Sequence, residues 1–140
     1  MILDRLLSLS DRLLRAAPAA AHCDIPCGIY VTEPAETAAT TVIKMQELLH
    51  DPTHTSAHDI ARITAVKEDY AERIKREVLV LWTDYFKPEH LERYPDLHTK
   101  VWETCKLAGA AKKSTDPATG EQVAAAVKEI AGIFHATKAG

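Results

Sequence analysis

Apolar residues recur at helical spacing along most of the chain after Pro34. Between Pro34 and His50 they lie three or four positions apart and so form one face of a predicted helix. This face consists of Ala35, Ala38, Ala39, Val42, Met45 and Leu49. Thr32 stands where an N-cap is expected, Pro34 suits the first turn, and Asp51-Pro52 ends the helix.

Three further helices follow from the same spacing. A long second helix begins after Ser56, which forms a capping-box pattern with Asp59, and it ends before Pro88. Its apolar face consists of Ile60, Ile63, Tyr70, Ile74, Val78, Leu81 and Tyr85. A third face consists of Leu97, Val101, Cys105 and Ala108, and a fourth consists of Val123, Val127, Ile130 and Phe134. Residues 112–120 are predicted to form the loop between them. With no alternating strand pattern, the chain is predicted to be all-α, an antiparallel up-and-down four-helix bundle.

The first 21 residues differ from the rest of the chain. Leucine and isoleucine recur at helical spacing among aspartates and arginines, and the small residues 16–21 (AAPAAA) follow. Small residues before His22 are similar to a protease cleavage site, whereas the interspersed charges argue against a secretory signal. We therefore predict a removable leader over residues 1–21 and one domain over residues 22–140. A permanent N-terminal helix is the alternative.

Composition narrows the possible partners and the compartment. The chain has 140 residues and a net charge of −3, with no basic stretch that would indicate nucleic acid. It contains no apolar run of about eighteen residues, so no membrane span is expected. Its 3 cysteines favour a reducing compartment or thiolates committed to a metal, which predicts a cytoplasmic protein.

The segment after the predicted leader carries the candidate chemistry. Cys23 and Cys27 lie four positions apart with Pro26 between them, so both thiolates can converge on one ion, and His22 adds an imidazole. Three side-chain ligands are one short of a closed zinc site. Cleavage before His22 would add an α-amino group, and with the Cys23 amide nitrogen this makes two nitrogens and two sulfurs in one plane. That geometry suits divalent nickel or copper. A disulfide between Cys23 and Cys27, or two spare thiols, is the alternative.

A family resemblance makes this segment more specific. The residues His22-Cys23-Asp24-Ile25-Pro26-Cys27-Gly28-Ile29-Tyr30 resemble the N-terminal signature of mature nickel superoxide dismutases. Residues 81–88 (LWTDYFKP), 94–98 (YPDLH) and 116–120 (DPATG) are similar to the same family, and the likeness covers residues 22–138. It implies a homohexamer of four-helix bundles with one nickel ion per subunit. It also implies disproportionation of superoxide to dioxygen and hydrogen peroxide by Ni(II)/Ni(III) cycling.

The resemblance also implies roles for particular residues. The metal ligands would be His22 through its amine and imidazole, Cys23 through its thiolate and amide nitrogen, and Cys27 through its thiolate. Tyr30 would join these as a catalytic residue, because it matches the tyrosine that crowds the open face of the metal. Asp24 and Tyr85 match family residues that surround the ligands.

Two positions depart from the family pattern. Ala38 stands where better-known members carry a glutamate that supports the axial imidazole, and Tyr70 stands where they carry an arginine. A metal-bound histidine usually donates its other ring nitrogen to an acceptor, for which Glu33 and Glu36 are candidates. A non-catalytic nickel- or thiol-binding helical bundle is the alternative to a redox enzyme.

Overall fold

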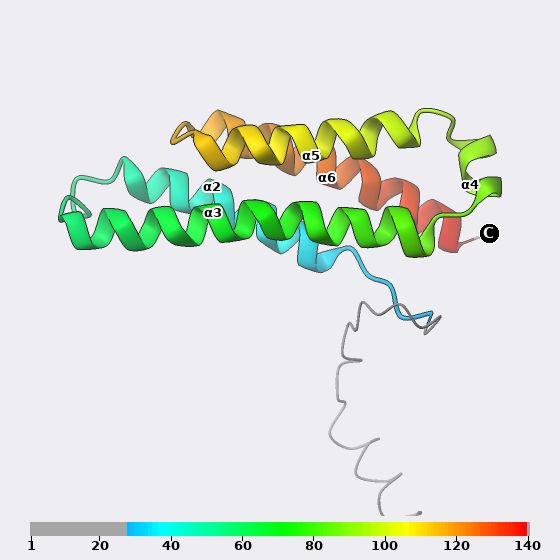
Figure 1. The fold of residues 1–140 in the computed structure, drawn as a ribbon, viewed down its shortest axis with the longest axis horizontal. Coiled ribbons are helices and arrows are strands. Elements are labelled where there is room, and N and C mark those ends of the chain that lie inside the picture. The colour runs from blue at the N-terminus through cyan, green and yellow to red at the C-terminus, as the bar shows by residue number, and fades with distance from the viewer. Residues whose placement is uncertain (1–27, 140) are drawn as a thin grey trace, which may run out of the picture. The chain divides into compact units, whose positions relative to one another are not determined.

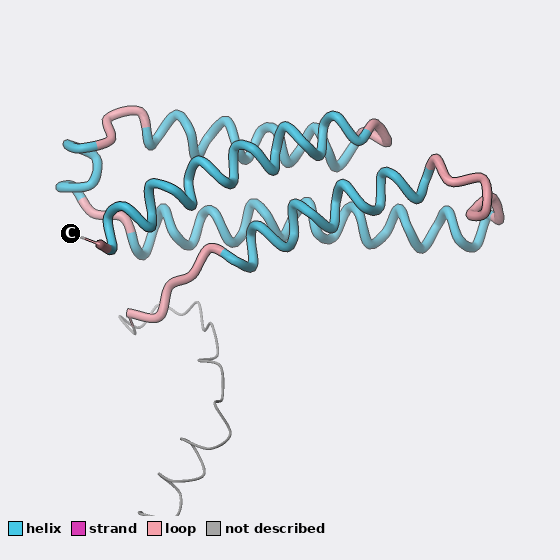
Figure 2. The backbone as a smooth tube through the Cα atoms, turned by 180° about the vertical axis from the view of Figure 1, so that it is seen from behind, coloured by secondary structure: helices cyan, strands magenta, loops and turns pink. Residues whose placement is uncertain are grey.

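The computed structural model describes residues 28–139, and helices make up most of them. The helices are α2 (Glu33–Leu49), α3 (Ala57–Val80), η1 (Leu81–Tyr85), α4 (Pro88–Arg93), α5 (Leu97–Lys113) and α6 (Pro117–Lys138). The four long helices form a closed ring in which α2 contacts α3 and α6, and α5 contacts the same two helices. Consecutive long helices run in opposite directions, and their connections lie at the two ends of the bundle (Figures 1 and 2). The predicted antiparallel four-helix bundle is confirmed, and the described residues contain no strand.

Each long helix buries most of the stripe that its periodicity predicts, whereas four of the predicted residues on the first two helices are only half-buried: Met45, Leu49, Tyr70 and Tyr85. Ile60 was expected in the core but is 43% exposed, because it lies in the first turn of α3, one turn before Ile63, the first α3 residue that is buried. Cys105 is half-buried, and Thr104 occupies the buried position on α5 beside it. None of the helices within residues 28–139 combines the length and apolar character that a membrane span needs.

The helix starts follow the predicted signals closely but not completely. Ser56 is the N-cap of α3, and its hydroxyl accepts a hydrogen bond from the Asp59 amide at 3.0 Å. Thr32 is the N-cap of α2 by position, but its hydroxyl donates to Glu36 Oε1 at 2.6 Å instead of capping a backbone amide. Side chains four residues apart lie next to each other on a helix, so the Glu36 carboxylate is close enough to accept a hydrogen bond from the Thr32 hydroxyl.

The predicted loop over residues 112–120 is wrong. Helix α5 continues to Lys113, and α6 already begins at Pro117, so only three residues separate them. Asp116 caps α6 by accepting a hydrogen bond from the Ala118 amide at 3.0 Å, and a proline is tolerated in the first turn that follows. The Asp-Pro pair marks a helix start rather than a loop.

Two short elements that the apolar pattern did not predict follow the end of α3. Residues Leu81–Tyr85 form a turn of π-helix, which changes the angular position of Tyr85 relative to an α-helical continuation. The short α4 follows, and the Nδ1 atom of its His90 accepts a hydrogen bond from the Lys87 amide at 3.1 Å. These elements connect α3 to α5.

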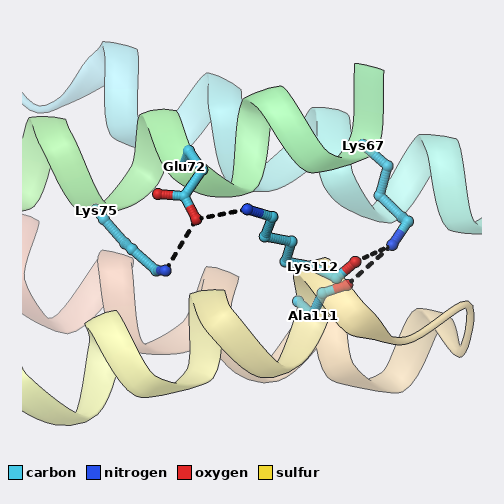
Figure 3. A network of polar contacts seen from close by, with 5 residues as sticks. All are labelled: Lys67, Glu72, Lys75, Ala111 and Lys112. Atoms are coloured by element: carbon cyan, nitrogen blue, oxygen red, sulfur yellow. Dashed lines mark hydrogen bonds and ion pairs between the residues drawn. The ribbon is translucent and has the colours of Figure 1, made fainter. Parts of the chain in front are cut away.

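Polar side chains are buried where α5 ends. Lys67, which is 2% exposed, directs its Nζ at the carbonyl oxygens of Ala111, Lys112 and Ser114. Two of these three contacts are drawn in Figure 3. Gln46 donates through Nε2 to Thr119 Oγ1 at 2.8 Å and to Ser114 O at 3.3 Å. Both side chains therefore satisfy carbonyls that the helix itself leaves without a partner.

Replacing Gly120 by alanine is expected to destabilise the bundle by about 1–3 kcal/mol, because the new methyl group overpacks the core. A Cβ there would lie 2.4 Å from Gln46 Oε1 and 2.8 Å from Ile43 Cγ1. Gly132→Ala on the same helix is the matched control, since its Cβ meets nothing within 4 Å and alanine favours the helix by about 1 kcal/mol. Urea unfolding of both variants measures the difference, and equal effects would contradict the packing argument.

Candidate metal centre

The predicted ligands lie outside the described residues. His22, Cys23, Asp24 and Cys27 fall in the part of the chain before Gly28, so their roles stay predictions. Among residues 28–139, no group of three or more His, Cys, Asp or Glu side chains could hold a metal ion.

The described part of the N-terminal unit is short. The chain divides into two units, and of the first, residues 1–31, the structure describes residues 28–31. Gly28 has φ +68°, a left-handed conformation that glycine adopts without strain. Tyr30 is buried, with 7% of its surface exposed.

Tyr85 is held at the end of the π-helical turn by aromatic rings and one hydroxyl. Its ring lies 4.5 Å from that of Phe134 and stacks on that of His90 at 5.6 Å. Its hydroxyl lies 2.9 Å from Thr137 Oγ1. Because the Thr137 hydroxyl donates to Phe134 O at 2.8 Å, the proton between Tyr85 and Thr137 comes from the tyrosine. The orientation of this phenol is therefore fixed by α6.

The two positions that depart from the family pattern have different surroundings. Ala38 is fully buried in α2, where its methyl group belongs to the core and offers no acceptor. Tyr70 is half-buried, and the Arg73 guanidinium lies 5.3 Å from the centre of its ring. The family arginine is expected at position 70. In this chain an arginine, Arg73, lies about one helical turn further along α3 and contacts the Tyr70 ring.

The candidate acceptors Glu33 and Glu36 both hold Thr32. Glu33 Oε2 accepts from the Thr32 amide at 3.1 Å, and Glu36 Oε1 accepts from the Thr32 hydroxyl. His135 Nε2 lies 3.3 Å from the same hydroxyl oxygen, which ties α6 to the start of α2. No local sequence pattern predicts this contact, because Thr32 and His135 lie 103 residues apart along the chain.

The bundle defines a class, a small all-α protein whose four long helices pack in one antiparallel ring. Comparison with known proteins then defines the family. Residues 17–138 match the family model described as nickel-containing superoxide dismutase. The chain is 46% identical over 118 residues to a superoxide dismutase [Ni] of Streptomyces seoulensis, covering 84% of this chain and 88% of the relative. It is also 46% identical over 121 residues to a superoxide dismutase [Ni] of Streptomyces coelicolor, with the same coverage.

Solved structures agree with these sequence matches. A native structure of nickel superoxide dismutase superimposes with a TM-score of 0.80 at 43% identity, covering 84% of this chain and 99% of the other. A second match is a crystal structure of a nickel-containing superoxide dismutase whose nickel ligation corresponds to the oxidized state. It superimposes with a TM-score of 0.80 at 44% identity, with the same coverage. The chain therefore belongs to the nickel-containing superoxide dismutases. It is a nickel-dependent oxidoreductase that acts on superoxide, with one nickel ion per subunit.

Proposed function

We propose that His22, Cys23 and Cys27 hold the nickel ion after residues 1–21 have been removed. One observation carries the proposal: the His-Cys-x-x-x-Cys segment directly follows the small residues 16–21, in a chain that belongs to this family. The alternative is a non-catalytic nickel- or thiol-binding bundle. The two Streptomyces relatives are named as enzymes, which favours the catalytic function over this alternative.

The donor set fits nickel. The Cys23 and Cys27 thiolates, the Cys23 amide nitrogen and the His22 amine would supply two sulfurs and two nitrogens, and the His22 imidazole would add a further nitrogen. Thiolates and a deprotonated amide donate electrons strongly, so they stabilise a higher oxidation state of the metal. When bound, nickel supplies one-electron chemistry by cycling between Ni(II) and Ni(III).

The remaining residues bind substrate and organise the segment. Two superoxide ions and two protons yield one dioxygen and one hydrogen peroxide. The Tyr30 hydroxyl is proposed to hold the small anion or a water molecule. Asp24 is proposed to organise the segment between the ligands, and Tyr85, held by Thr137, is proposed to support the site.

The assembly and its maturation are further parts of the proposal. We infer a homohexamer, a protease that cuts between Ala21 and His22, and a cytoplasmic location. Trp102 and Leu79 support a subunit contact, because they are 57% and 44% exposed although they are large and apolar. Trp102 therefore does not belong to the core of its own bundle.

The mass of the protein from its native host, combined with metal analysis, tests the proposal. We expect an N-terminus at His22 and one nickel ion per chain. Active protein that retains Met1, or processed protein that binds nickel without consuming superoxide, would contradict it.

A further inference from the structure

A groove of about 590 Å³ lies between α3 and α5. The charged side chains that line it are Lys75, Lys106, Lys112, Lys113 and the carboxylate of Glu72. Positive charge thus prevails in the groove although the whole chain carries a net charge of −3. The volume lies within the range of about 300–1,000 Å³ that is typical of small-molecule sites.

Glu72 shows how the groove holds an oxyanion. The Nζ atoms of Lys75 and Lys112 each lie 3.0 Å from the same oxygen, Glu72 Oε1 (Figure 3). The two ammonium groups can therefore be no more than twice that distance apart. Hydrogen bonds from Lys112 and then Lys75 hold the pKa of the Glu72 carboxyl below its usual value. One carboxylate leaves most of the positive charge in the groove uncompensated.

The floor of the groove is fixed by α5. Gly109 has no side chain, and Lys75 Nζ lies 3.6 Å from where its Cβ would stand, so the ammonium group lies close over the helix. Lys67 binds the carbonyls of Ala111 and Lys112 from the other side and so holds the turn that carries Lys112 (Figure 3). It also offsets the partial negative charge of the helix C-terminus, which would otherwise repel an anion.

We propose that the groove between α3 and α5 binds a small phosphate-bearing anion with two or more negative charges. One oxyanion group takes the place of the Glu72 carboxylate between Lys75 and Lys112. Lys106 and Lys113 offset the remaining charge. An anion with a single negative charge should bind weakly, because it only replaces the negative charge that the Glu72 carboxylate already supplies.

Titration of the native, nickel-loaded protein with inorganic pyrophosphate at constant ionic strength tests the site by calorimetry. Lys75→Gln and Lys112→Gln should each weaken binding roughly fivefold, the upper range for a partly exposed ion pair. Lys44→Gln is the matched control, because Lys44 pairs with Glu47 at 3.1 Å on α2, outside the groove. It should leave the affinity unchanged.

Glu72→Gln separates a binding site from a structural ion-pair network. Removing the competing carboxylate should tighten pyrophosphate binding several-fold, in the direction opposite to the lysine variants. Partial unfolding cannot produce a tighter complex, so this result does not depend on the stability of the variants. The proposal is overturned if the wild-type protein does not bind, if Lys44→Gln weakens binding equally, or if Glu72→Gln fails to tighten it.

Discussion

Serine in place of Cys23 or Cys27 is expected to abolish superoxide dismutation, with a loss of more than about a hundredfold. Removing a group that merely supports a metal ligand already costs about 10–100-fold in metal affinity or activity, so loss of the ligand itself costs at least as much. A serine hydroxyl remains protonated near neutral pH and is a poor replacement for a soft thiolate donor. Activity and nickel content, measured on the same preparations, should fall together.

Cys105→Ser is the matched control for these substitutions. Cys105 is half-buried on α5, and burial raises the pKa of its thiol, so it stays protonated and uncharged at neutral pH. We expect full nickel content and full activity in this variant. Retained activity in either of the other two serine variants would remove the proposed ligand set, whereas loss of activity in all three would point to a general effect of cysteine replacement.

The helices were predictable because their signal is local. A stripe such as Val123, Val127, Ile130 and Phe134 repeats at 3.6 residues, and the same four residues are buried in α6. The π-helical turn does not follow that period, and the six-residue α4 is too short to carry a stripe. The sequence therefore predicted that the second helix ends before Pro88, but it did not predict the π-helical turn that follows Val80 or the short α4 that begins at Pro88.

The buried polar groups were not predictable for a different reason. Lys67 and Gln46 are buried because carbonyls 44 to 68 residues further along the chain accept their hydrogen bonds. No pattern within one helix contains that information, and composition alone predicts an exposed lysine. The candidate ligands are the opposite case, because the spacing of His22, Cys23 and Cys27 is local and the family resemblance assigns them.

A chain that begins at His22 is expected to be active, whereas a chain that keeps the single residue Ala21 is expected to be almost inactive. One extra residue converts the His22 α-amino group into an amide, which removes a nitrogen donor and leaves every side chain unchanged. We expect activity to fall by more than about a hundredfold, as for loss of a thiolate.

Both chains can be produced by cutting a fusion protein at a chosen position, and superoxide consumption is then measured on each after incubation with nickel. Circular dichroism provides the control, because the bundle from Glu33 to Lys138 is the same in both chains and should melt at the same temperature. Equal activity would show that the His22 amine is not a ligand, and the proposed donor set would then be wrong at that position. If the two chains are equally stable and only the chain that begins at His22 is active, cleavage of the bond between Ala21 and His22 is what makes the enzyme active. Nothing else differs between the two chains.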